Sequence, residues 1–152
     1  MSVATLVLAA AATTVSGSYD CTVDQVTAVS IEGGKATASM IEGLPADSMK
    51  FGLEFKGDDA SIEWPNSPIQ VSGKQTVLPT APGAGMILAV SPGPCLFTER
   101  SCATMVNYAQ QADGSLKLLL TPTAVSSDRD HKLRFPFLVS MEGSCSVRKR
   151  NQ

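Results

Sequence analysis

Aromatic residues and long hydrophobic runs are both scarce in this chain. Among its 152 residues there are one Trp, two Tyr and five Phe. Binding sites for sugars and single-stranded nucleic acids usually stack the ligand on aromatic rings, so few such sites can be built here and no nucleic-acid partner is expected. No segment approaches the ~20 apolar residues that cross a bilayer as a helix, so the sequence predicts no transmembrane segment.

Charge is scarce as well. Charged residues make up 17% of the chain, against about 25% in a typical soluble protein. The formal net charge of −2 gives no strong field toward nucleic acid or an acidic membrane. Residues 148–152 carry three bases, Arg148, Lys149 and Arg150, which we interpret as a solvated basic C-terminal tail. A docking patch for an anionic partner is the alternative.

Catalytic motifs are missing from the sequence. Its single histidine, His131, lies in "SSDRDHK" beside Asp128 and Asp130. A Gly-x-Ser-x-Gly elbow, a phosphate-binding loop and a dinucleotide fingerprint are all absent, so we expect no cofactor and no catalytic residue marked by a local motif. Asp58 and Asp59 lie in the turn signal "KGDDAS" without an EF-hand pattern, so no metal site is predicted there.

The N-terminus resembles a secretory signal. An uncharged apolar run, residues 3–12, is followed by small and polar residues up to Ser18. Small residues permit cleavage after Gly17 or Ser18, although no Lys or Arg precedes the apolar run. We therefore predict a signal peptide over 1–18 and a periplasmic or secreted β domain over 19–147. The alternative is a buried first strand or a short Ala-rich helix.

The four cysteines, Cys21, Cys95, Cys102 and Cys145, are spaced with 73, 6 and 42 residues between them. Zinc sites need closely spaced ligand pairs, and a redox pair of the Cys-x-x-Cys type has two intervening residues, so two disulfides are the better interpretation in an exported protein. Alternation of apolar and polar residues over 133–142 places Cys145 on the buried face of the last strand, and Cys21 shares parity with Val23. We predict a Cys21–Cys145 bridge between the first and last strands, and a Cys95–Cys102 bridge that closes a local loop.

Strand patterns cover almost all of residues 19–147. "KFGLEFKG", residues 50–57, alternates with its apolar side chains on one face, and a parity change in "TVDQVTAVSI" indicates a bulge near Asp24. The two prolines of "SIEWPNSPIQVSG" favour an edge strand over 61–73. The apolar run from Met86 to Val90 predicts a central strand covered on both faces.

The clearest hairpin signal is "CATMVNYAQQADGSLKLLLT", residues 102–121. A two-residue Asp-Gly turn would mix apolar and polar faces. A three-residue loop, 112–114, instead sets Val106 opposite Leu120 and Tyr108 opposite Leu118, with Gly114 in the left-handed region. We expect the second register because it keeps the apolar residues together.

These patterns predict an all-β fold, a single antiparallel β-sandwich or small closed barrel of about eight short strands. The expected function is that of an exported, non-enzymatic domain that binds a protein or small ligand, in one version as an inhibitor-like module. A hydrolase-type enzyme with His131 in a loop-built site, or a structural or assembly component of the cell envelope, are the alternative hypotheses. A disulfide-closed loop presents its side chains with little ordering entropy left to lose, and the residues that it would present for binding are Phe97, Thr98, Glu99 and Arg100.

Overall fold

The computed structural model describes residues 14–32, 35–65, 70–91, 102–124, 126–127, 133–134 and 138–149 of the chain. This part of the chain is built from strands, with a single 3-10 helix, η1, at Ala46–Met49. No helix in these ranges has the length and apolar character needed to cross a membrane. The strands are β1 Gly17–Glu32, β2 Lys35–Met40, β3 Lys50–Lys56, β4 Asp59–Glu63, β5 Gln70–Val77, β6 Ala84–Ser91, β7 Cys102–Gln110, β8 Leu116–Ala124, β9 Ser126–Ser127, β10 Leu133–Arg134 and β11 Leu138–Val147.

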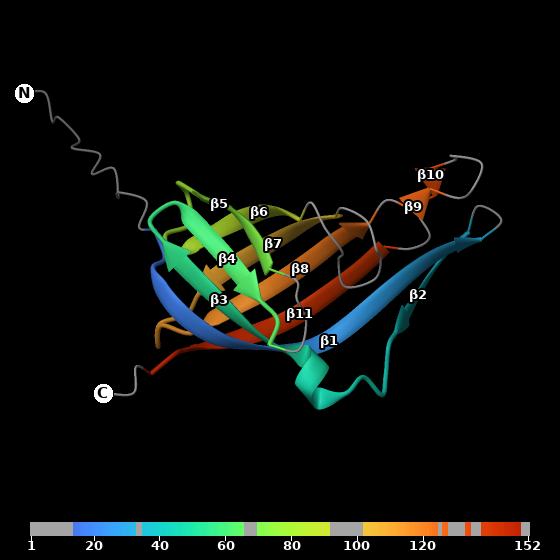
Figure 1. Ribbon diagram of the computed structural model, residues 1–152, viewed down its shortest axis with the longest axis horizontal. Coiled ribbons are helices and arrows are strands. Elements are labelled where there is room, and N and C mark those ends of the chain that lie inside the picture. The colour runs from blue at the N-terminus through green and yellow to red at the C-terminus, as the bar shows by residue number, and fades with distance from the viewer. Residues whose placement is uncertain are drawn as a thin grey trace, which may run out of the picture.

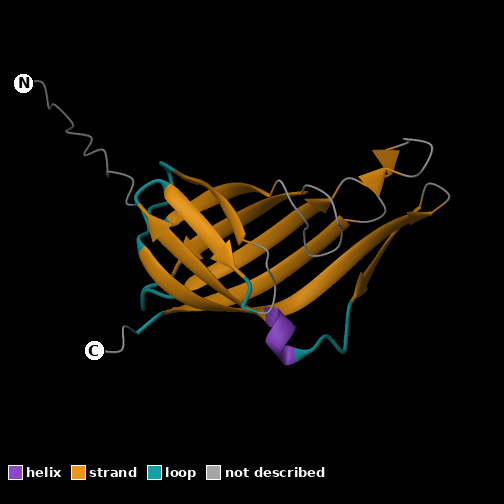
Figure 2. Ribbon diagram, in the orientation of Figure 1, coloured by secondary structure: helices purple, strands orange, loops and turns teal. Residues whose placement is uncertain are grey.

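Eight strands close into an antiparallel barrel (Figures 1 and 2). Neighbours in the barrel follow the chain from β3 to β8, then β11, which pairs with β1 and closes the ring. Closure removes the unpaired edges of the sheet. β2 is an additional strand on β1, and β9 pairs with β10 in a separate two-stranded sheet. The predicted all-β fold is confirmed, and of the two architectures the barrel is the one formed.

β1 changes its neighbour along its length. Its first part, residues 17–22, pairs with β3, and its last part, residues 27–32, pairs with β2. Between them the register with β11 shifts across Val23 and Gln25, which leaves Asp24 as the extra residue of a β-bulge and confirms the bulge expected from the parity change. The bulge lets one strand serve the barrel and then continue into the β1–β2 hairpin.

Inward-pointing side chains fill the barrel where the described strands surround it. Phe51, Leu53 and Phe55 of β3 are each at most 3% exposed, while Lys50 and Lys56, which flank them, are exposed. The Phe55 ring lies 5.2 Å from Tyr108 in an edge-to-face contact. The alternation read in residues 50–57 therefore predicted the correct inward face.

The seam between β1 and β11 carries the Cys21–Cys145 disulfide. The two cysteines are opposite each other in the register and are 2% and 3% exposed. Met141 and Val139, further along β11, are also buried, as the alternation in the last strand predicts. Phe135 and Phe137 of the expected strand lie outside the described residues. The prediction that the first and last strands are disulfide-linked is confirmed.

The β7–β8 hairpin has the predicted three-residue loop. Val106 pairs with Leu120 and Tyr108 with Leu118, and Gly114 has a φ of 83°, a region that disfavours side chains with a β-carbon. Asp113 accepts hydrogen bonds from the backbone N–H and hydroxyl of Ser115 at 2.9 and 2.6 Å. These bonds lower the pKa of the Asp113 carboxyl.

Two sequence predictions were wrong. β6 is not covered on both faces, because Ile87 and Ala89 are fully buried whereas Leu88 and Val90 are 55% and 57% exposed. β4 is not an edge strand, because it pairs with β3 on one side and β5 on the other. The β4–β5 pairing ends at Glu63, so Pro65 lies beyond the ladder and does not interrupt it.

Candidate functional site

The residues predicted to bind a partner lie in a connection between two barrel strands. β6 ends at Ser91 and β7 begins at Cys102, so the connection spans residues 92–101. The predicted site residues lie outside the described part of the chain, as does the histidine: Cys95, Phe97, Thr98, Glu99, Arg100 and His131. The Cys95–Cys102 bridge and the binding role of the four loop residues therefore stay predictions.

The register of the barrel strands places the boundaries of the β6–β7 connection and of the β8–β11 connection at the same end of the barrel. Ser91 pairs with Cys102, which pairs in turn with Ala124 at the end of β8. β11 begins at Leu138, and antiparallel order brings its start to the same end. We call this the loop end. Gly17, at the start of β1, and Val147, at the end of β11, lie at the opposite end, which we call the terminal end.

The terminal end is closed by a buried amide. Gln75 of β5 is 7% exposed, and its Nε2 donates to the Val15 carbonyl at 3.1 Å and to the Gly57 carbonyl. Its Oε1 accepts a hydrogen bond from the Tyr108 hydroxyl at 2.7 Å, and burial raises the pKa of that hydroxyl. The side chain of Gln75 therefore joins three segments, and its polar atoms are all engaged.

Tyr108 needs space that a glycine provides. A β-carbon at Gly85 of β6 would overlap the Tyr108 hydroxyl oxygen, far inside van der Waals contact. Glycine is therefore required at this position for the ring to reach Gln75. This arrangement is structural: it holds the end of the barrel together and presents no reactive group.

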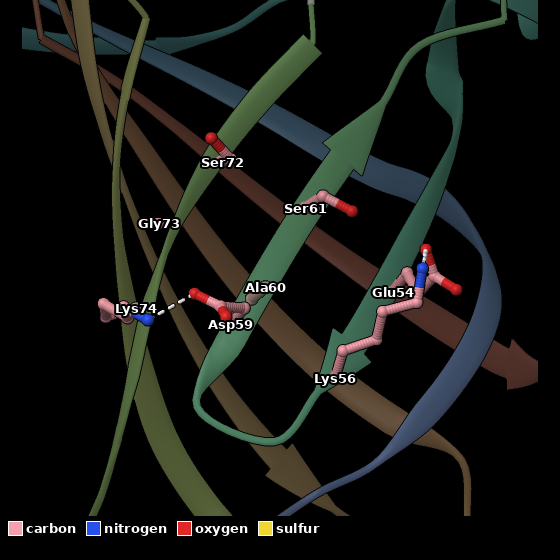
Figure 3. A pocket seen from close by; sticks show the side chains of 8 residues that line it. All are labelled: Glu54, Lys56, Asp59, Ala60, Ser61, Ser72, Gly73 and Lys74. Carbon is pink, nitrogen blue, oxygen red and sulfur yellow. Dashed lines mark hydrogen bonds and ion pairs between the residues drawn. The ribbon is translucent and has the colours of Figure 1, made fainter.

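Charged residues line a shallow hollow on the outer face of β3, β4 and β5 (Figure 3). Two cross-strand rows form it, Glu54–Ser61–Ser72 and Lys56–Asp59–Lys74. The Lys74 ammonium lies 2.5 Å from an Asp59 carboxylate oxygen, and Lys56 lies 3.1 Å from Glu54. The neighbouring Asp59 raises the pKa of Lys74, first through this hydrogen bond and then through its charge. The two cations are thus matched by two carboxylates.

The hollow was missed by sequence reasoning. Its residues occupy alternate positions of three strands, and only the strand register brings them side by side. Asp59, which follows the turn after β3, faces Lys74. Within the described ranges, no group of three or more His, Cys, Asp or Glu side chains is arranged to hold a metal ion.

The start of the basic C-terminal segment lies against the barrel. Arg148 Nε donates to an Asp20 carboxylate oxygen of β1 at 2.7 Å, and the Arg148 backbone N–H donates to the Ser18 carbonyl at 2.8 Å. This guanidinium group also lies over Gly52, where a β-carbon would approach its Nη2 to 2.7 Å. Arg148 therefore extends the β1–β11 seam beyond the end of β11.

No protein family, curated protein or solved structure matches this chain. The chain's own geometry offers a packed barrel, a charge-balanced hollow on its outer face and a loop end, where the boundaries of the longest connections meet.

Proposed function

We propose that this chain is an exported, non-enzymatic binding domain that recognises a protein or small ligand at the loop end of its barrel. The recognition segment is the connection 92–101, with Phe97, Thr98, Glu99 and Arg100 as its contact residues. The observation that carries the proposal is the pairing of Ser91 with Cys102 and of Cys102 with Ala124. A rigid sheet thereby holds both boundaries of the predicted recognition segment.

Preorganisation is the physical basis of this proposal. A segment anchored on two hydrogen-bonded strands, and closed by the predicted Cys95–Cys102 bridge, has little conformational entropy left to lose when it binds. Aromatic residues, phenylalanine among them, and arginine are both enriched in protein interfaces. Phe97 and Arg100 fit that description.

Export is supported by the apolar run of residues 3–12 and by the disulfide at the barrel seam. Disulfides persist in oxidising compartments, such as the periplasm and the extracellular space, and are rare in the reducing cytosol. The described part of the chain buries the Cys21–Cys145 bridge in the core, so the bond is a lasting element of the fold.

Side chains fill the interior of the barrel where the described strands surround it. This favours a binding site at an end or on the outer face over one inside the lumen. Leu53, Ile87, Val106, Leu116 and Leu120 are fully buried and point into the lumen. Eight-stranded barrels have an interior just wide enough for side chains to fill or for one small ligand to occupy. Here the described strands use that space for packing.

The test compares binding by loop variants with binding by a control at the other end. Wild-type protein is used to capture partners from an extract of its native host, and each captured partner or ligand is then titrated against purified variants. Phe97→Ala with Arg100→Ala is expected to weaken binding at least about tenfold, equivalent to about 1.4 kcal/mol. Gln111→Ala, in the exposed β7–β8 loop of the terminal end, should bind like wild type. Unchanged affinity of the double variant would refute the proposal.

A further inference from the structure

Among the described residues, strand β2 has one edge without a partner strand. It pairs with β1 along residues 35–40, and in the described part of the chain no other strand pairs with it. All six of its side chains are exposed. Figures 1 and 2 show the β1–β2 hairpin projecting beyond the barrel, with β2 on its outer side.

The phase of the β1–β2 ladder identifies the free backbone groups. The Ile41 N–H donates to the Val26 carbonyl at 2.9 Å, so Ile41 belongs to the hydrogen-bonded set. Facing pairs alternate between bonded and non-bonded along an antiparallel ladder. Residues 35, 37 and 39 therefore bond to β1. The N–H and C=O groups of Ala36, Ala38 and Met40 point away from β1 to the open side.

This edge lacks the features that usually block strand pairing. Natural edge strands are protected by charged side chains, prolines or bulges. In β2 the only charge is Lys35, at its first position, and residues 36–40 are Ala, Thr, Ala, Ser and Met. The three outward N–H and three outward C=O groups therefore form an open template for another strand.

We propose that β2 pairs with β2 of a second copy of this chain, antiparallel, with the two Ala38 residues facing each other on a two-fold axis. In this register Ala36 faces Met40 of the second copy, and Thr37 faces Ser39 of the second copy. The outward groups of Ala36, Ala38 and Met40 in the two strands then form six hydrogen bonds. Lys35 faces Ile41 of the second copy, so no two like charges are opposed.

A second copy fits this edge better than a foreign peptide. When a protein adds a peptide strand to its edge, pockets for alternate side chains give the sequence preference. All six side chains of β2 are exposed, and Ala36, Ala38 and Ser39 are small, so the strand offers little for the side chains of a peptide to bind. A two-fold contact needs only self-complementarity, which the register supplies. It also covers the Met40 side chain, 61% exposed in the single chain, with Ala36 of the second copy.

Crosslinking and sedimentation test the proposed pairing. Ala38→Cys places two thiols face to face on the two-fold axis, at the roughly 5.5 Å separation between α-carbons of a hydrogen-bonded pair, which a disulfide can span. Mild oxidation is expected to give a covalent dimer. Ser72→Cys is the matched control, because Ser72 is exposed on β5 but has strands on both sides.

Ala38→Lys opposes two charges on the axis and is expected to raise the dimer dissociation constant at least about tenfold, whereas Ser72→Lys should leave it unchanged. Far-ultraviolet circular dichroism and thermal unfolding check that each variant keeps the fold. Each of the following results would overturn the proposal: wild-type protein that sediments as a monomer at every concentration, a dimer insensitive to Ala38→Lys, or equal crosslinking of the two cysteine variants. The same holds for a monomer whose β2 edge binds only foreign strands.

Discussion

Removal of the Cys21–Cys145 disulfide should be the most costly change among the cysteines. The bridge joins residues 124 positions apart, so it restricts nearly the whole unfolded barrel. In the chain-entropy model, a loop of this length corresponds to about 5 kcal/mol of stabilisation at 25 °C. The predicted Cys95–Cys102 bridge would close a loop of about eight residues and contribute about 2.5 kcal/mol in the same model.

Backbone pairing also holds β1 and β11 together in the folded barrel. This pairing runs from Tyr19 with Val147 to Val29 with Leu138, so we expect the native register to survive loss of the covalent bond. Most of the loss then comes from the greater freedom of the unfolded chain. We expect Cys21→Ala with Cys145→Ala to lower the free energy of unfolding by about 3–5 kcal/mol. Alanine is preferred to serine because the site is 2–3% exposed and a buried hydroxyl would need a partner.

Urea unfolding monitored by circular dichroism measures this loss. The slope of the transition should also rise, because the unfolded chain without the bridge exposes more surface. The extrapolated free energies must therefore be compared, not the midpoints alone. Cys95→Ala with Cys102→Ala is the matched control. A loss below about 1 kcal/mol for the Cys21 and Cys145 pair, in a still-cooperative transition, would refute the chain-entropy reasoning.

Four further outcomes are expected. Gly114→Val should cost about 1–2 kcal/mol in urea unfolding because of the positive φ, and equal stability would contradict the proposed loop strain. Gln75→Leu should cost about 2–4 kcal/mol in the same assay, since the buried Tyr108 hydroxyl and Val15 carbonyl lose their partner and the Gly57 carbonyl loses a bond as well. Tyr108 gives a prediction for stability against pH. Burial raises the pKa of Tyr108 in the folded state, so its contribution is complete below about pH 10 and is lost as pH rises through the raised value. Tyr108→Phe should flatten that decline in unfolding titrations, and an unchanged profile would assign it to other groups. Intact mass from a native host should place the mature N-terminus near Ser18 or Tyr19, and retained Met1 on the soluble protein would reject export.

Local patterns were enough to predict individual strands. The alternation in residues 50–57, the bulge near Asp24 and the Ala112–Gly114 loop follow from the chemistry of a few neighbouring residues, and each is present in the structure. A one-residue slip in any of them would turn apolar side chains outward. The cost of exposing these side chains depends on a few neighbouring residues, so a short stretch of sequence is enough to predict the correct register.

Closure of the sheet is a different matter, because it depends on β1 meeting β11. No pattern within either strand predicts that β1 pairs with β11. The parity of Cys21 and Cys145 was the only sequence signal that indicated this pairing. The misassigned faces of β6 have the same origin. A barrel has only one covered face, so Leu88 and Val90 are exposed even though the run around them is apolar. The outer hollow of β3–β5 likewise arises from strand register, which the sequence does not carry in any one segment.

The residues just before β1 belong to the predicted signal peptide, but one of them is buried in the folded barrel. Val15 is 2% exposed at the terminal end, and burying such a side chain contributes about 1.5–3 kcal/mol. Cleavage after Gly17 or Ser18 would remove it, yet the β1–β11 pairs from Tyr19 onward and the bond from Tyr108 to Gln75 would remain. Gln75 would also keep the Gly57 carbonyl as an acceptor. The amide of Gln75 would therefore still close the terminal end of the barrel after such a cleavage, so removal of the predicted signal peptide would be compatible with an intact fold at a moderate loss of stability.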